Sequence, residues 1–103
     1  MPTASADRRI ELRSLALHRS VAEMIRRDPL AIERALSNLV RWETSVQCSW
    51  IGEWRELLLG PRERLLTFLT EQSERADRLR QSSPFASVLP SSERRRIHES
   101  HAA

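Results

Sequence analysis

The chain has 103 residues and a mass of 12.0 kDa, which is enough for one domain with one modest hydrophobic core and excludes a second domain. Only two residues are glycine, while 40% are hydrophobic, and this composition favours an all-α protein over a turn-rich β protein. The 17 basic residues are all arginine and stand against 14 acidic residues, so the formal net charge is only +3. Because the two signs are interspersed along most of the chain, the charge lacks the clustering that is typical of a nucleic-acid binder.

The cysteine content and the N-terminal sequence predict a cytoplasmic protein. A single cysteine, Cys48, cannot form an internal disulfide, and no N-terminal segment joins a basic start to a long apolar run. No stretch approaches the roughly 20 apolar residues that span a bilayer, so we expect no membrane insertion.

The first amphipathic helix is predicted from Asp7 to Arg27. Its apolar stripe consists of Ile10, Leu15, Leu17, Val21, Ala22, Met24 and Ile25. The pair Asp28-Pro29 predicts a stop and an immediate restart, because proline disfavours helical geometry in the residue before it but suits the first position of a helix. A second helix is therefore expected from Pro29 to Glu43, with Asp28 as its N-cap. Its predicted buried face consists of Ile32, Ala35, Leu36, Leu39 and Val40.

Two shorter helices follow a polar run. The third is predicted over residues 50–59, with Ser49 as N-cap and Gly60 at its end. The fourth is predicted over residues 61–69 and begins at a proline. Its apolar side chains are Leu65, Leu66, Phe68 and Leu69.

A fifth helix, rich in charge, is predicted over residues 71–81, with Thr70 as its N-cap. It carries two acid-before-base pairs at the i, i+4 spacing, each of which stabilises an exposed helix by a few tenths of a kcal/mol. These pairs are Glu71 with Arg75 and Glu74 with Arg78. Only two apolar residues lie in the segment, so we expect the helix to be weakly attached to the bundle.

Residues 82–90 have no helical period, contain two prolines and carry three large apolar side chains, Phe85, Val88 and Leu89. Two interpretations stay open. The segment folds back and fills a groove of its own bundle, or it is an arm whose side chains dock on another protein. A last short helix is expected from Ser91 or Ser92 to Glu99.

The predicted architecture is thus a single all-α domain. It consists of a compact bundle of about four helices, a charged fifth helix, and an extended C-terminal arm. The helical part covers residues 1–81 and the arm covers residues 82–103.

Catalytic and metal-binding patterns are weak in this sequence. His98 and His101 share a spacing of three, but no third ligand lies near them, so we expect solvated side chains. His18 is expected to be a packing or capping residue, and Cys48 lacks the surroundings of a nucleophile. Two isolated glycines exclude a glycine-rich phosphate loop. We therefore predict a protein without enzymatic activity, metal or other cofactor.

Three tryptophans lie within a short stretch, and two of them, Trp50 and Trp54, share one helix face. Core packing is their default role, but a partly exposed ring would be a binding hot spot. The run Arg94-Arg95-Arg96 is flanked by glutamates and is expected to be a solvated terminus.

Several segments together resemble a known family: Ser14 to Ala22, Ile25 to Pro29, Asn38 to Trp42, Trp54 to Pro61 and Leu79 to Ala86. The most specific element is the run Arg-Gln-Ser-Ser-Pro-Phe that begins at Arg80. The sequence resembles a bacterial family of small helical proteins, sometimes fused to a helix-turn-helix domain and encoded beside nucleotidyltransferase-like genes in arrangements like toxin–antitoxin pairs. The resemblance covers roughly residues 8–97 and implies an antitoxin-like partner that binds and inhibits the neighbouring enzyme.

From the residues and the resemblance together, we predict a protein-binding module that occludes a toxin enzyme. The residues expected to contact it are Trp50, Trp54, Arg78, Arg80, Gln81, Pro84, Phe85, Val88 and Leu89. The main alternative is a DNA-binding transcriptional regulator that contacts phosphates through its arginines. A small enzyme built on His18 or Cys48 is a third hypothesis, and self-association through the tryptophan face stays open.

Overall fold

The computed structural model describes residues 2–45 and 48–100, with side chains described from residue 8 onward. This part of the chain is all-helical and contains no strand. Its helices are α1 (Pro2–Arg27), α2 (Leu30–Glu43), α3 (Ser49–Leu59), α4 (Arg62–Leu69), α5 (Glu74–Arg80) and α6 (Ser91–Ser100). None of these described helices combines the length and the apolar character that crossing a bilayer requires.

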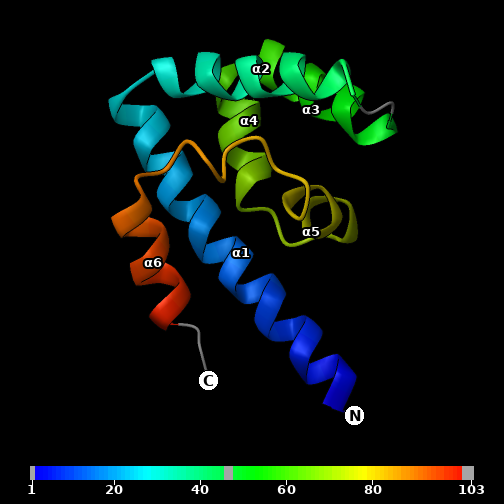
Figure 1. Ribbon diagram of the computed structural model, residues 1–103, viewed down its shortest axis with the longest axis vertical. Helices are drawn as coiled ribbons and strands as arrows, with labels where there is room; N and C mark the ends of the chain where they lie inside the picture. Colours follow the sequence, from blue (N-terminus) through cyan, green and yellow to red (C-terminus); the bar gives the residue numbers. More distant parts are fainter. Residues whose placement is uncertain (1, 46–47, 101–103) are drawn as a thin grey trace.

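The long helix α1 is the element around which the others pack. It contacts α2, α4, α5 and α6, while α3 packs on α2 and α4. In Figure 1, α2 and α3 lie together across one end of α1, and α6 runs beside α1. The N-terminal turns of α1 extend beyond the other helices (Figure 1).

This arrangement corrects two positions of the predicted apolar stripes. Ile10 is 42% exposed, because it lines cavities between α1 and the helices α5 and α6 and is not part of the core. Val40 is 61% exposed. The buried row of α2 is Ala31, Ala35 and Leu39, and Val40 lies about 100° further round the helix from Leu39.

Helices α2 and α4 begin one residue later than predicted, so Pro29 occupies the N-cap position that was expected for Asp28, and Pro61 is the N-cap of α4. Asp28 accepts a hydrogen bond at Oδ1 from the backbone N–H of Leu30 (3.1 Å). The cap predicted at Ser49 is wrong, because Cys48 occupies the N-cap position and no side chain caps α3. The cap predicted at Thr70 is also wrong. Ser73 caps α5 instead, through a bond that its Oγ accepts from the backbone N–H of Ala76 (3.2 Å).

The segment between α5 and α6 forms consecutive turns that pack against the bundle, which corrects the prediction of an extended arm. It crosses from α5 to α6 over the front of the molecule in Figure 1. Phe85 is fully buried and Leu89 nearly so, as part of the same core as α1 to α5. Asn38 of α2 donates from Nδ2 to the carbonyl oxygen of Pro84 (2.8 Å) and to Ser87 Oγ (3.0 Å). The fold-back interpretation therefore describes this segment.

Candidate functional site

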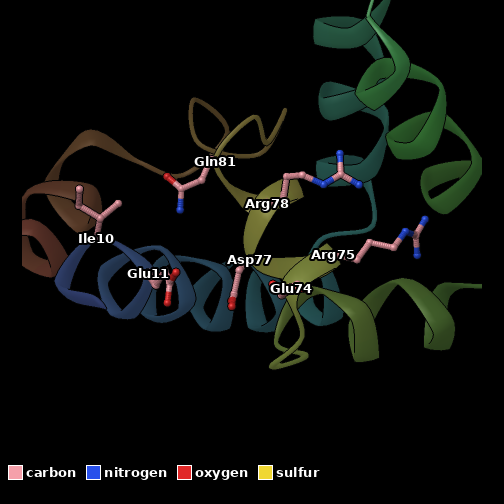
Figure 2. Close-up of a pocket in the computed structure, with 7 residues that line it drawn as sticks. All are labelled: Ile10, Glu11, Glu74, Arg75, Asp77, Arg78 and Gln81. Atoms are coloured by element: carbon pink, nitrogen blue, oxygen red, sulfur yellow. The ribbon is translucent and has the colours of Figure 1, made fainter. Parts of the chain in front are cut away.

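A cavity of about 770 Å³ lies between α1 and α5 (Figure 2). Two residues of α1, four of α5 and the residue that follows α5 line it. They are Ile10, Glu11, Glu74, Arg75, Asp77, Arg78 and Gln81. We call this cavity the α1–α5 cleft.

The short helix α5 places most of these side chains. Seven residues are too few to form a stable helix in isolation, so α5 depends on its cap at Ser73 and on packing. Its two apolar residues, Ala76 and Leu79, are fully buried against the core. Burying this face leaves three charged side chains of α5 exposed, those of Glu74, Arg75 and Arg78.

The basic side of the cleft is held by one carboxylate from another helix. Glu53 of α3 pairs with Arg75 (3.3 Å) through Oε1 and with Arg78 (3.5 Å) through Oε2. The guanidinium group of Arg75 also lies 5.1 Å from the ring centroid of Phe68, within cation–π range. The predicted pairs within α5 are therefore wrong: Glu71 lies before the helix begins, and both arginines turn towards α3.

The acidic side of the cleft faces α1. Figure 2 shows the guanidinium groups of Arg75 and Arg78 pointing away from Glu11 and Asp77. Glu11 pairs with Arg8 at 3.5 Å on the exposed turns of α1, and Glu74 forms no ion pair among the described residues. The cleft thus presents separate acidic and basic sides, with the exposed apolar side chain of Ile10 at its edge.

The structure separates the nine residues predicted to contact a partner. Only Arg78 and Gln81 are exposed, and both line the cleft. Trp50 and Val88 are half-buried, and Trp50 packs on Trp42 with 5.7 Å between ring centroids rather than lining the cleft. The remaining five are buried: Trp54, Arg80, Pro84, Phe85 and Leu89.

Arg80 illustrates how a buried residue of the predicted contact set stabilises the fold. Its guanidinium group donates from Nη1 to the carbonyl oxygens of Leu69 (3.2 Å) and Glu71 (2.7 Å), and from Nη2 to Asp77. These bonds satisfy the carbonyl of Leu69 at the C-terminal end of α4, which helix geometry leaves without a partner, and the carbonyl of Glu71 in the loop before α5. The side chain of Arg80 is 1% exposed, so it offers no contact surface to a docking protein.

His18 is buried in α1 and accepts or donates nothing to a neighbouring side chain in the described part of the chain. Its Nδ1 lies 2.7 Å from the carbonyl oxygen of Ser14. Burial lowers the pKa of His18 to about 4, the bond to Ser14 opposes this shift, and the charge of Arg80 adds to it. At neutral pH the ring is therefore uncharged.

The other candidate residues do not form a catalytic or metal cluster. Cys48 and His98 are exposed, and His101 lies outside the described residues. Among the side chains that the structure describes, no three His, Cys, Asp or Glu residues gather as a metal ion would require.

The predicted contact set omitted five of the seven residues that line the cleft, namely Ile10, Glu11, Glu74, Arg75 and Asp77. It also omitted Glu53, which pairs with both arginines of the cleft. Ile10 was assigned to the core because its spacing fits the apolar stripe of α1. Glu53 carries no local signal, since its two arginine partners lie far along the chain on another helix. No protein-family model, curated protein or solved structure matches this chain.

Proposed function

We propose that this protein is a protein-binding module without chemistry of its own, which binds and restrains an enzyme encoded beside its gene, as an antitoxin does. The α1–α5 cleft is the contact surface. The observation that carries the proposal is the position of Ile10, an apolar side chain 42% exposed at the edge of a cleft with acidic and basic sides. The resemblance around the Arg-Gln-Ser-Ser-Pro-Phe run supports the antitoxin role.

The exposed turns of α1 support this choice of surface. A helix that extends past its bundle gains little from tertiary packing, and packing supplies most of the stability of helices in proteins. A partner that covered Ile10 and entered the cleft would supply that packing. Its surface would carry a basic group towards Glu11 and an acidic group towards Arg78, in addition to an apolar centre.

The mode of inhibition differs from the arm that the sequence suggested. With Pro84, Phe85 and Leu89 in the core, the segment supports the cleft instead of inserting into the enzyme. Arg78 and Gln81 are the members of the predicted contact set that reach a partner without unfolding. The protein would therefore inhibit the enzyme by binding it through the folded surface around the cleft, without inserting an arm.

The arginine distribution counts against the DNA-binding alternative. Eight arginines form ion pairs with carboxylates among the described residues. Paired guanidinium groups on several helices differ from the contiguous basic face that phosphate binding requires.

Co-purification tests the proposal with two matched substitutions. The full chain is co-expressed with the product of the adjacent gene, as wild type, Ile10→Asp or Val40→Asp. Both variants place a carboxylate at an exposed apolar position, but only Ile10 lines the cleft. We expect the enzyme to be captured and inhibited by wild type and Val40→Asp and released by Ile10→Asp. Equal capture by all three forms, or by none, would contradict the proposal.

A further inference from the structure

A second cavity, of about 280 Å³, lies between α1, the segment after α5, and α6. Its lining contains three arginines, Arg13, Arg80 and Arg94, and two histidines. None of the described residues that line it is acidic. Figure 1 shows α6 running beside α1, and the two helices are in contact. Positive charge therefore gathers in this cavity, in contrast to the mixed charge of the α1–α5 cleft.

Two of the three arginines are uncompensated. Arg80 pairs with Asp77, whereas Arg13 and Arg94 form no ion pair among the described residues. Arg13 lines the cavity from α1 and is half-buried, and Arg94 lines it from α6 and is exposed. Guanidinium groups placed in this way bind oxyanions through paired, charge-assisted hydrogen bonds.

Two buried side chains that line the cavity carry unused hydrogen-bonding atoms. His18 Nε2 and Arg80 Nε are buried and have no hydrogen-bond partner among the described residues. Because His18 Nδ1 lies at hydrogen-bond distance from the carbonyl oxygen of Ser14, the neutral ring carries its proton on Nδ1, and Nε2 is an acceptor. Arg80 Nε is a donor. Buried polar atoms in native proteins are nearly always paired, so this donor and this acceptor indicate a missing partner.

We propose that this cavity binds a small organic phosphate monoester. A singly protonated phosphate group offers oxygens that accept from Arg80 Nε, Arg13 and Arg94, and an O–H that donates to His18 Nε2. A carboxylate lacks this donor. The apolar part of the ligand would pack on Leu17 and Ile97, which also line the cavity. The volume lies near the lower end of small-molecule sites.

The protonation of His18 agrees with this assignment. Because burial holds its pKa at about 4, Nε2 keeps its lone pair at neutral pH. The groups that line the cavity together with the ring are cationic or neutral: Arg13 and Ser14 on α1, Arg80 at the end of α5, and Arg94 and His98 on α6. A bound phosphate would offset their charge.

The test uses phenyl phosphate as the probe and two neighbouring arginines as matched variants. Arg94 and Arg95 are both exposed on α6, but only Arg94 lines the cavity. We expect phenyl phosphate to shift the NMR resonances of the His18 ring nitrogens. Arg94→Gln should raise the dissociation constant of phenyl phosphate about tenfold, the effect of losing a hydrogen bond to a charged group. Arg95→Gln should change it less than about twofold.

Three comparison ligands separate the parts of the proposal. Benzoate should bind more weakly than phenyl phosphate because it offers no O–H, and inorganic phosphate should bind more weakly because it lacks the apolar part. Phenol should not shift the His18 ring. The proposal is overturned if Arg94→Gln and Arg95→Gln weaken binding equally, which would show diffuse attraction to cations, or if benzoate or inorganic phosphate binds as tightly as phenyl phosphate. An unchanged His18 ring would likewise overturn it and assign the two unpaired atoms to water.

Discussion

The indole of Trp54 and the ring of Phe85 meet edge to face, with 6.1 Å between their centroids and 72° between their planes. Trp54 also donates from Nε1 to the carbonyl oxygen of Leu79 at 3.0 Å. One side chain of α3 thus holds both the end of α5 and the turn that follows it. Aromatic pairs of this geometry stabilise a core beyond the effect of their buried area. Phe85, the last residue of the Arg-Gln-Ser-Ser-Pro-Phe run, therefore belongs to the folded core.

Replacing Phe85 tests this relationship. Phe85→Ala should lower the free energy of unfolding by about 3–5 kcal/mol, because it removes a fully buried ring and leaves a cavity. Such a loss is a large part of the stability of a small domain. Phe85→Asp should lower the free energy of unfolding further, since it buries a carboxylate. Urea unfolding followed by circular dichroism measures both, and Val40→Ala, at an exposed position, should change stability by less than about 0.5 kcal/mol. Native helicity and an unchanged midpoint for Phe85→Asp would show that the ring lies outside the core.

Even a conservative substitution of Arg80 should destabilise the fold. Its planar group reaches two backbone carbonyls and one carboxylate at once, which a lysine ammonium on a flexible stem cannot do. We expect Arg80→Lys to lower the free energy of unfolding by about 2–3 kcal/mol. Arg78→Lys is the matched control, because Arg78 is exposed and should cost less than about 0.5 kcal/mol. Equal effects of the two substitutions would contradict a structural role for Arg80.

His18 should make stability depend on pH. The folded protein holds the pKa of His18 at about 4, below its ordinary value of 6.5, so the unfolded chain binds more protons between these two pH values. The contribution of the neutral His18 ring to the free energy of unfolding is complete above pH 6.5. It is lost as the pH falls towards 4, by up to about 1.4 kcal/mol for each pH unit. His18→Gln should flatten the profile of unfolding free energy in this window. His98→Gln, at an exposed position, should leave the profile unchanged, and the same flattening in both variants would contradict this account.

The helices themselves could be predicted from the sequence, because apolar spacing and proline positions are local signals. The starts at Leu30 and Arg62 lie one residue from those predicted, since proline restricts the backbone whatever packs around it. The start of α5 could not be predicted in this way. Thr70 and Ser73 are both acceptable caps, and the choice between them depends on which register buries Ala76 and Leu79.

The candidate site was harder to predict for the same reason. Phe85 and Leu89 have the character of either a binding arm or a core segment, and only the presence of Trp54 opposite Phe85 decides between them. Arg78 and Gln81 were identified because they are polar residues beside that segment. Ile10 was missed because its apolar spacing is that of a core residue, while the actual end of the bundle depends on where α5 and α6 pack along α1.

Asn38 should control how firmly the turns after α5 are held. Its amide nitrogen donates to the Pro84 carbonyl oxygen and to Ser87 Oγ. Asn38→Ala should lower the free energy of unfolding by about 1–2 kcal/mol and speed amide exchange at Val88, whose N–H bonds to the Phe85 carbonyl oxygen. Ser37→Ala, at an exposed neighbour on α2, is the control. Unchanged exchange at Val88 would show that packing alone holds the turns.

Hydrogen exchange on the complex with the enzyme from the neighbouring gene tests the central claim most directly. If the α1–α5 cleft is the contact surface, amides of residues 8–11 and 74–81 should become slower to exchange on binding, and those of residues 83–89 should stay protected as in the free protein. Loss of protection at residues 83–89 in the complex would contradict this account, because it would show that the segment leaves the core to act as the arm. Failure of the two proteins to form a complex would contradict the proposed function itself.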